Sequence, residues 1–135
     1  MVWANGGEIC QFAAGQRAER RVSIIYKICE RALWQEAERS GVFQGAPVDA
    51  RDGFIHFSTA EQVAETAARH FAGAHGLVLI AVDADTLGGA LRYEASRGGA
   101  LFPHLYGALP LRSVRWVKPL PLAPDGGHVF PELIA

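Results

Sequence analysis

Residues 54–58, Phe-Ile-His-Phe-Ser, place an imidazole and a hydroxyl where both could act on one ligand. If the segment is extended, side chains alternate between two faces, so Phe54, His56 and Ser58 share one face. The free N–H groups of residues 59–61, at the start of a predicted helix, favour an anion such as phosphate. His56 could donate to that anion or act as a general acid or base. The alternative is that His56 is buried and bonded to the backbone, and that Ser58 only caps the helix. The sequence leaves both interpretations open.

Residues 102–107, Phe-Pro-His-Leu-Tyr-Gly, bring a second histidine close to a tyrosine. Pro103 disfavours helical backbone at Phe102, and an extended chain would project His104 and Tyr106 to the same side. Together these two side chains could recognise a ring or an oxyanion. The alternative is a packed loop in which the tyrosine hydroxyl bonds a carbonyl.

Glu94 and Arg69 are two further charged residues that could reach the same ligand. Glu94 ends a short predicted strand over residues 91–94, where a carboxylate could orient a hydroxyl or stabilise developing positive charge. Arg69 lies on a predicted helix and could extend toward a bound phosphate. For each residue the alternative is a solvated surface position, where an ion pair contributes little to stability.

Metal binding is not predicted, because His56, His70 and His75 lack the spacing of a helical metal-binding pair. Asp83 and Asp85 follow a strand, and without further ligands they are interpreted as turn residues. The chain also lacks a G-x-S-x-G elbow, a phosphate-binding P-loop, a dinucleotide fingerprint and the context of a cysteine nucleophile. Common hydrolase and nucleotide triphosphatase mechanisms therefore have no support.

The elements that must position these residues alternate between β-type and helix-type runs, which predicts an α+β fold. The apolar run 77–82 predicts a central strand covered on both faces. Ser-Thr-Ala-Glu at residues 58–61 has capping-box spacing, so a helix is expected to begin there. Residues 43–53, rich in glycine, proline and aspartate, are predicted to be a loop. The further predicted elements are strands at 24–28, 54–57 and 114–118, a helix between the first strand and Gly41, and a helical turn at 87–90.

Composition places the chain among single-domain globular proteins. It has 135 residues, half of them hydrophobic, and a formal net charge of −1, so no global field attracts nucleic acid or an anionic membrane. Residues 1–22 hold no period long enough to bury a face, so a flexible N-terminal extension is predicted there, followed by a domain over residues 23–135.

Three sequence features bear on the cellular location: the length of the apolar runs, the N-terminal pattern and the cysteines. The longest apolar run is far shorter than a membrane span, and the N-terminus has no secretory signal pattern. Cys10 and Cys29 suggest no disulfide framework. These features favour reduced thiols in the cytoplasm.

The strings Gly-Phe-Ile-His-Phe-Ser (53–58) and Phe-Pro-His-Leu-Tyr-Gly (102–107), with residues 24–27 and 93–94, resemble the DUF952 family of small bacterial proteins of uncharacterised function. The resemblance covers about residues 24–132. It implies an ADP-ribosyltransferase-like fold, in which a split β-sandwich has helices packed on it.

Within that fold, residues 55–58 resemble the strand that supports the nicotinamide end of NAD. They are also similar to the RNA 2′-phosphotransferase branch, whose pattern matches His56, Ser58, Arg69 and residues 82–84. The site that the resemblance implies has two groups of residues, catalytic His56, Glu94 and His104, and binding residues Ser58, Thr59, Arg69 and Tyr106. NAD is the cofactor that the resemblance suggests.

Three functions remain open at this point. The first is an enzyme acting on NAD, an ADP-ribosyl group or a phosphorylated substrate, and the second is a non-catalytic module that binds a nucleotide or a small anion. The third is a structural or protein-interaction domain. The expected partner is a small molecule or nucleotide, with no membrane; nucleic acid is not expected, although an RNA end stays open, and the oligomeric state is not determined.

Overall fold

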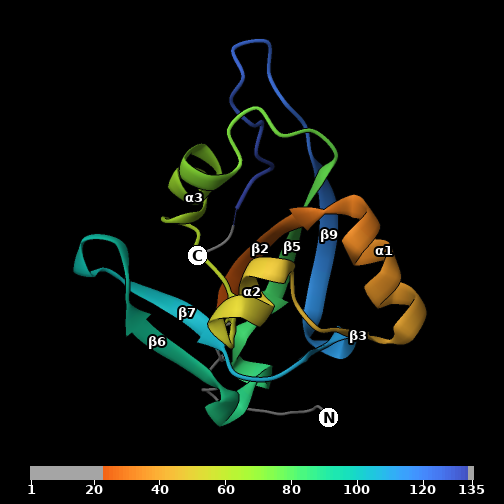
Figure 1. Ribbon diagram of the computed structural model, residues 1–135, viewed down its shortest axis with the longest axis vertical. Helices are drawn as coiled ribbons and strands as arrows, with labels where there is room; N and C mark the ends of the chain where they lie inside the picture. The colour runs from red at the N-terminus through yellow and green to blue at the C-terminus, as the bar shows by residue number, and fades with distance from the viewer. Residues whose placement is uncertain (1–22, 134–135) are drawn as a thin grey trace, which may run out of the picture.

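The computed structural model describes residues 23–133 (Figure 1). The predicted extension over residues 1–22, which includes Cys10, lies outside the described residues. The described chain is a mixed α/β single domain with antiparallel sheets, in agreement with the predicted α+β class.

A three-stranded antiparallel sheet forms the centre of the domain. It contains β2 (Ile24–Glu30), β5 (Leu77–Asp83) and β9 (Val114–Leu120), in the order β2-β5-β9. Every residue of β5 is buried, which confirms the prediction of a central strand covered on both faces. Seven continuous residue pairs join β2 to β5, so the register of this pair is fixed over its whole length.

Two helices cover opposite faces of the central sheet. Alternate residues of β2 and β5 belong to two separate hydrophobic clusters, as the period of a strand requires. Helix α1 (Arg31–Ser40) adds Trp34 and Ala37 to one cluster and ends at Gly41 in the left-handed conformation, as predicted. Helix α3 (Val63–His70) adds Val63 and Ala67 to the other.

A second antiparallel sheet carries most of the predicted site. It has the order β4-β7-β6, from β4 (Ile55–His56), β7 (Leu101–Leu105) and β6 (Leu91–Ala95), and the β6–β7 hairpin projects from the body of the domain (Figure 1). The backbones of Tyr26 and Ser58 exchange two hydrogen bonds of 2.8 and 2.9 Å, which connect this sheet region to β2. The remaining elements are β3 (Val42–Phe43), paired with β8 (Leu109–Pro110), and the 3-10 turns Ala84–Thr86, Gly88–Ala90, Arg97–Gly99 and Leu111–Ser113.

The predicted loop over residues 43–53 is wrong, because it contains helix α2 (Pro47–Asp52). Proline suits the first helical position, where no N–H needs a partner. The Asp49 carboxylate accepts from the Ala46 N–H at 2.7 Å, and Gly53 ends the helix at φ +88°. The proline, aspartate and glycine that suggested a loop are thus the start and stop signals of a short helix.

The predicted capping box at residues 58–61 is also wrong. Ser58 is still paired with β2, so the chain is extended there, and α3 begins only at Val63. The Ser58 hydroxyl lies 2.8 Å from the Thr66 hydroxyl instead of capping. The turn is closed one residue later, where Gln62 Oε1 accepts from the Thr59 N–H at 3.0 Å.

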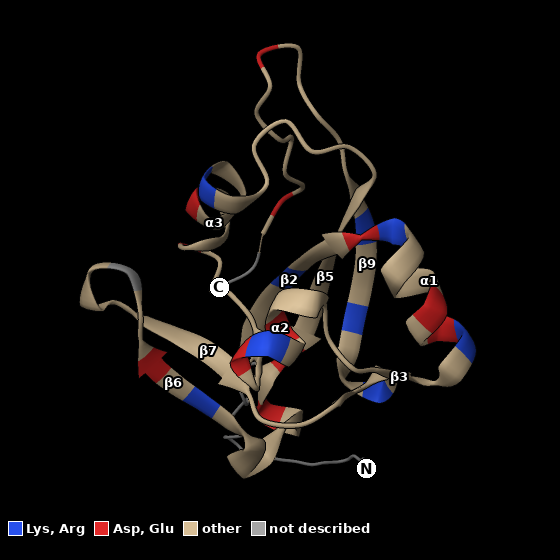
Figure 2. Ribbon diagram, in the orientation of Figure 1, with Lys and Arg blue, Asp and Glu red and all other residues tan. Residues whose placement is uncertain are grey.

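Charged residues are distributed over most elements, with Lys and Arg interspersed among Asp and Glu (Figure 2). No helix within residues 23–133 has the length and apolar character to cross a membrane.

Candidate functional site

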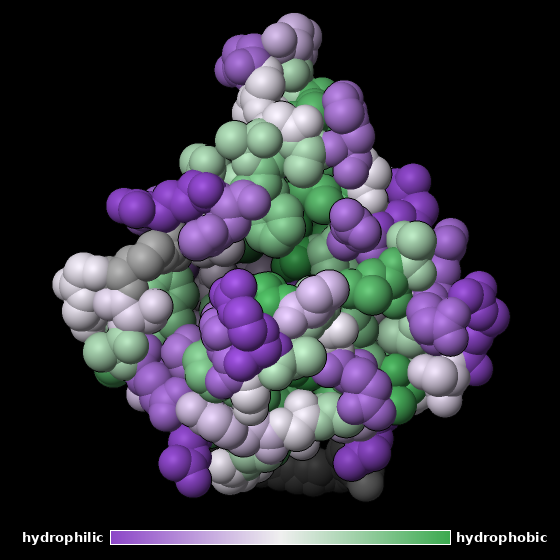
Figure 3. All heavy atoms as spheres, in the orientation of Figure 1, coloured by the Kyte–Doolittle hydropathy of each residue, from purple (hydrophilic) through white to green (hydrophobic). Residues whose placement is uncertain are grey.

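A cleft of about 520 Å³ opens beside β2, between α2, α3 and β7. Aromatic rings of Tyr26, Phe57, Phe71 and Phe102 form part of its wall. In Figure 3, hydrophilic residues stand at the rim of a hollow whose floor is hydrophobic. The ionisable residues that line the cleft are Lys27, Arg51, Asp52, His56, His70 and His104. Such a surface suits a ligand with an aromatic ring and a charged group.

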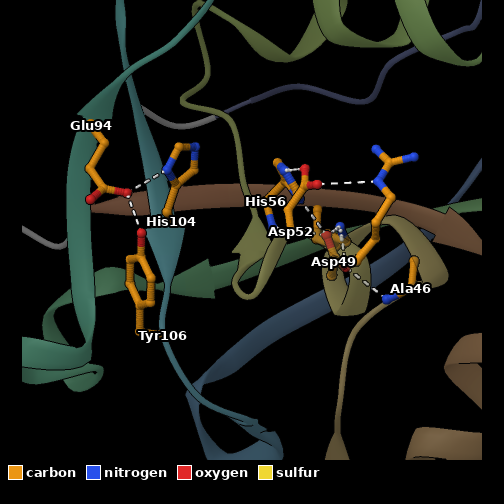
Figure 4. A network of polar contacts seen from close by, with 9 residues as sticks. Ala46, Asp49, Asp52, His56, Glu94, His104 and Tyr106 are labelled. Atoms are coloured by element: carbon orange, nitrogen blue, oxygen red, sulfur yellow. Dashed lines mark hydrogen bonds and ion pairs between the residues drawn. The ribbon is translucent and has the colours of Figure 1, made fainter.

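His104 and Glu94 form a histidine–carboxylate pair at one wall of the cleft. His104 Nδ1 lies 2.8 Å from Glu94 Oε1, and the Tyr106 hydroxyl donates to the same oxygen at 2.8 Å (Figure 4). These two hydrogen bonds, the one from His104 first, lower the pKa of Glu94. The bond to Glu94 in turn raises the pKa of Tyr106. Glu94 is therefore an acceptor that fixes the orientation of both side chains.

The second ring nitrogen of His104 is directed away from Glu94, on the side of His56 (Figure 4). The residue is only 6% exposed, it lines the cleft, and no described residue provides a hydrogen-bond partner for Nε2. Phe54 stacks on the ring with centroids 4.1 Å apart, which holds its plane. Because Nδ1 must donate to a carboxylate, Nε2 of the neutral ring is a base that faces the ligand space.

His56 has a carboxylate at each ring nitrogen. Nδ1 lies 2.6 Å from Asp49 Oδ1, and Nε2 lies 3.0 Å from Asp52 Oδ2. A carboxylate only accepts hydrogen bonds, and a neutral imidazole can donate from only one nitrogen. Both contacts are satisfied together when His56 is the imidazolium cation.

Asp49 is the buried anchor of this arrangement. Its oxygens accept from the Lys27 ammonium at 2.8 Å, from both the ring and the backbone N–H of His56, and from the Ala46 N–H. Burial acts to raise the pKa of Asp49, but the hydrogen bond from His56 and the charge of Lys27 outweigh it and hold the pKa at about 2. Lys27 is itself 5% exposed, so each buried charge has a partner.

The two histidines are brought together by strand pairing. His56 on β4 is directly opposite His104 on β7, and their ring centroids are 5.6 Å apart. Glu94 on β6 lies diagonally across from His104, within reach of a long side chain. The predicted sharing of a face by Phe54 and His56, and by His104 and Tyr106, agrees with their contacts.

The other predicted site residues have mixed positions. Ser58 is buried, lines the cleft and is bonded to Thr66. Thr59 and Arg69 are not among the lining residues, and the Arg69 guanidinium pairs with Glu65 at 2.8 Å on an exposed turn of α3. Of the predicted site residues, His56, Ser58 and His104 line the cleft, whereas Thr59, Arg69, Glu94 and Tyr106 do not.

Lys27, Asp49 and Asp52 were missed by sequence reasoning. A single lysine among the apolar residues of 24–29 could have signalled a buried partner, because an isolated charge is costly in a strand covered on both faces. The two aspartates stand three positions apart, a spacing that puts both on one side of a helix once α2 is recognised. Within residues 23–133, no three His, Cys, Asp or Glu side chains are grouped as potential metal ligands.

Comparisons with other proteins place the chain among relatives of similar size. Residues 28–117 match the sequence model of a family described as "Protein of unknown function (DUF952)". The X-ray structure of protein CC0527 from Caulobacter crescentus is similar at a TM-score of 0.77, with 50% identity, over 79% of this chain and 94% of that chain. A solution NMR structure of CC0527 gives a TM-score of 0.70 with 52% identity, over 77% and 90%. None of the curated proteins matches the chain in sequence.

Proposed function

Because the chain belongs to the DUF952 family, whose function is unknown, its activity has to be inferred from its own cleft, and we propose that it is an enzyme transferring a group on a nucleotide-type substrate. The substrate class is NAD, an ADP-ribosyl compound or another phosphorylated molecule with an aromatic ring. One observation carries the proposal: Nε2 of His104 has no hydrogen-bond partner among the described residues, and the ring is buried, oriented by Glu94 and directed to the cleft.

His104 is the general base of the proposed reaction. In transfer of a phosphoryl group, Nε2 takes the proton from the attacking hydroxyl or water and later returns it to the leaving oxygen. In transfer of an ADP-ribosyl group from NAD, nicotinamide leaves as a neutral base, so Nε2 releases the proton to solvent. Glu94 stabilises the imidazolium that forms, since its Oε1 already accepts from Nδ1. In this proposal Glu94 is a positioning residue, because it does not line the cleft and both of its partners are protein groups.

His56 acts as a fixed cation rather than a proton carrier. Releasing a proton from either ring nitrogen would break a contact with Asp49 or Asp52. The aromatic residues of the cleft wall, including Tyr26 and Phe102, would pack against the base or nicotinamide ring. An ADP-ribosyltransferase-like split sandwich is part of the proposal, and the two three-stranded antiparallel sheets with flanking helices support it.

Binding is tested first by thermal shift. NAD, ADP-ribose, AMP and inorganic phosphate are screened against the full chain, the His104→Gln variant and a control, His75→Gln, whose histidine is exposed and outside the cleft. A ligand at 100 times its Kd adds about 2.7 kcal/mol to stability, which raises the Tm of a domain of this size by several degrees. A flat response to all four compounds would contradict the proposed substrate class.

Turnover of any compound that binds is then measured by chromatographic detection of released nicotinamide, ADP-ribose or phosphate. We expect His104→Gln and Glu94→Gln to lower kcat by about 100-fold or more while the thermal shift persists. Unchanged kcat in His104→Gln would rule out its role as the base.

A non-catalytic nucleotide or anion module is the second candidate. The observation that favours it is the saturation of both His56 nitrogens, which suits binding rather than proton exchange. It predicts ligand-dependent stabilisation in the unmodified chain with no turnover of any bound compound.

A further inference from the structure

We propose that His56 Nε2 and the Arg51 guanidinium form the subsite for a phosphate group, and that the Asp52 carboxylate holds the place of that phosphate until it is displaced. The inference rests on the proposed function for the substrate class and adds the location of the anionic group. Asp52 then acts as an internal mimic that competes with the substrate.

The geometry of Asp52 is that of a bound anion. Its Oδ2 lies 3.0 Å from His56 Nε2, and its Oδ1 accepts from Arg51 Nε at 3.2 Å. Two oxygens of one group thus face two cationic donors, which is what a phosphate offers as well. All three residues line the cleft, and Figure 4 shows the contacts of His56 with Asp52 and Asp49.

The cation beneath Asp52 is built into the core. His56 is held from behind by Asp49, which is 2% exposed and also pairs with the buried Lys27. Without Asp52, the cations Lys27, Arg51 and protonated His56 face the single carboxylate of Asp49. Two positive charges then remain, which matches a phosphate dianion.

The position of Asp52 allows its carboxylate to move away from His56 and Arg51. It is the last residue of α2, its side chain is 35% exposed, and Gly53 follows in the left-handed conformation. A carboxylate at a helix C-terminus is disfavoured by the helix dipole, so α2 does not itself retain Asp52 there. The contacts with His56 and Arg51 are what hold it.

The subsite is also correctly placed for the proposed base. The rings of His56 and His104 are 5.6 Å apart and both residues line the cleft, so a group bonded to His56 Nε2 and the ring of His104 share the same cleft. His70 lies across the cleft on α3 and adds a further potential donor.

The test is a titration of inorganic phosphate, and then of AMP, by isothermal calorimetry into the full chain and its variants. Asp52→Asn removes the competing charge, and we expect the phosphate Kd to fall about two- to fivefold, the scale of an exposed ion pair. Arg51→Gln should raise the Kd. The control is Asp125→Asn, the same exchange in an exposed turn outside the cleft, which should leave the Kd unchanged.

An unchanged or weaker phosphate affinity in Asp52→Asn would overturn the inference, and so would an equal gain in Asp125→Asn, since that would be a general effect of charge. In the same variants, ¹⁵N NMR of the His56 ring should show Nε2 responding to phosphate. If His104→Gln retains turnover while Asp52→Asn binds phosphate more tightly, the proposed function fails and the subsite stands. If His104→Gln loses turnover while Asp52→Asn does not bind phosphate more tightly, the subsite is wrong and the proposed function stands.

Discussion

Two histidines on neighbouring strands have different partners, and the partners determine what each ring can do. His104 has one carboxylate, Glu94, which leaves Nε2 available to exchange a proton with a ligand. His56 has two, Asp49 and Asp52, which occupy both of its ring nitrogens. The residue type alone could not distinguish these roles, because the difference lies in groups from helix α2 and strand β6.

The buried Lys27–Asp49 pair should dominate the stability of the site. Asp49→Asn leaves the Lys27 ammonium buried without a carboxylate, and we expect the free energy of unfolding to drop by about 3–5 kcal/mol. Adding Lys27→Met removes the unpaired charge and should restore part of the loss. Urea unfolding of both variants measures the difference. A double variant no more stable than Asp49→Asn would show that the unpaired charge is not the cause.

The same carboxylate predicts how stability depends on pH. The pKa of Asp49 is about 2 in the folded chain, below its ordinary value near 3.8. Its contribution, about 2 kcal/mol, is therefore complete above about pH 5, well above the unfolded pKa, and is lost as the pH falls through the folded pKa near 2. Urea unfolding at several pH values should show this decline, and Asp49→Asn should show a smaller one. Parallel declines in both proteins would contradict the assignment.

At the scale of elements, helix α2 is the part on which the site depends most. Its six residues supply Asp49, Arg51 and Asp52, and it reaches the cleft because Gly45 lets the chain turn tightly in front of it. Gly45 has φ +104°, and a Cβ there would lie 2.9 Å from Asp49 Cβ.

Gly45→Ala should therefore disturb both the backbone and the carboxylate. The matched control is Gly41→Ala, which has φ +92° with nothing within 4 Å of the added carbon. We expect the control to cost about 1–2 kcal/mol from backbone strain alone. Gly45→Ala should cost more and also shift the ring resonances of His56, measured by NMR. Equal costs and an unchanged His56 spectrum would show that the contact with Asp49 does not matter.

The longer elements were predictable from the sequence, and the short ones were not. The continuous apolar sequence of β5 extends over seven residues, and α1, whose apolar residues have helical spacing, extends over more than two turns. Patterns of this length rarely arise by chance. Helix α2 has only six residues, and its proline, aspartate and glycine are equally frequent in loops. The Ser58 cap failed because a backbone pairing with Tyr26, remote in sequence, kept the chain extended.

At the scale of the candidate site, the sequence located the two histidine-containing strings and the side each ring faces. It could not locate Lys27 and Asp49, because their pairing joins residues 22 positions apart through tertiary packing. It also assigned Arg69 to the ligand, whereas the nearest opposite charge on its own helix, Glu65, pairs with it. The local sequence pattern predicts which face of a strand or helix a side chain lies on. Which of these faces come into contact depends on the tertiary fold.

In the whole molecule, burial is concentrated in strands β2 and β5 of the central sheet and is low in β6, one strand of the projecting hairpin. Leu79 to Val82 are fully buried, whereas β6 is half-exposed or exposed throughout. The molecule therefore combines a rigid support under His56 with a less protected wall that carries Glu94.

Amide hydrogen exchange should report this contrast. We expect the β5 amides to exchange only on global unfolding, and the β6 amides bonded to β7 to exchange at least about 100-fold faster through local opening. NMR exchange at neutral pH measures both sets. Equal protection in the two strands would show that the hairpin opens only with the rest of the domain.

The pairing of His56 opposite His104 has a consequence for how such a chain can vary over evolutionary time. A deletion or insertion of one residue inside 54–57 or 101–105 would rotate one ring to the opposite face of the sheet, so lineages that keep both rings together must keep the lengths of these strands. The turn at 96–100 and the segment 84–90 lie outside this constraint and can gain or lose residues. Length variation among descendants of this chain should therefore accumulate in those two places and be purged from the strands.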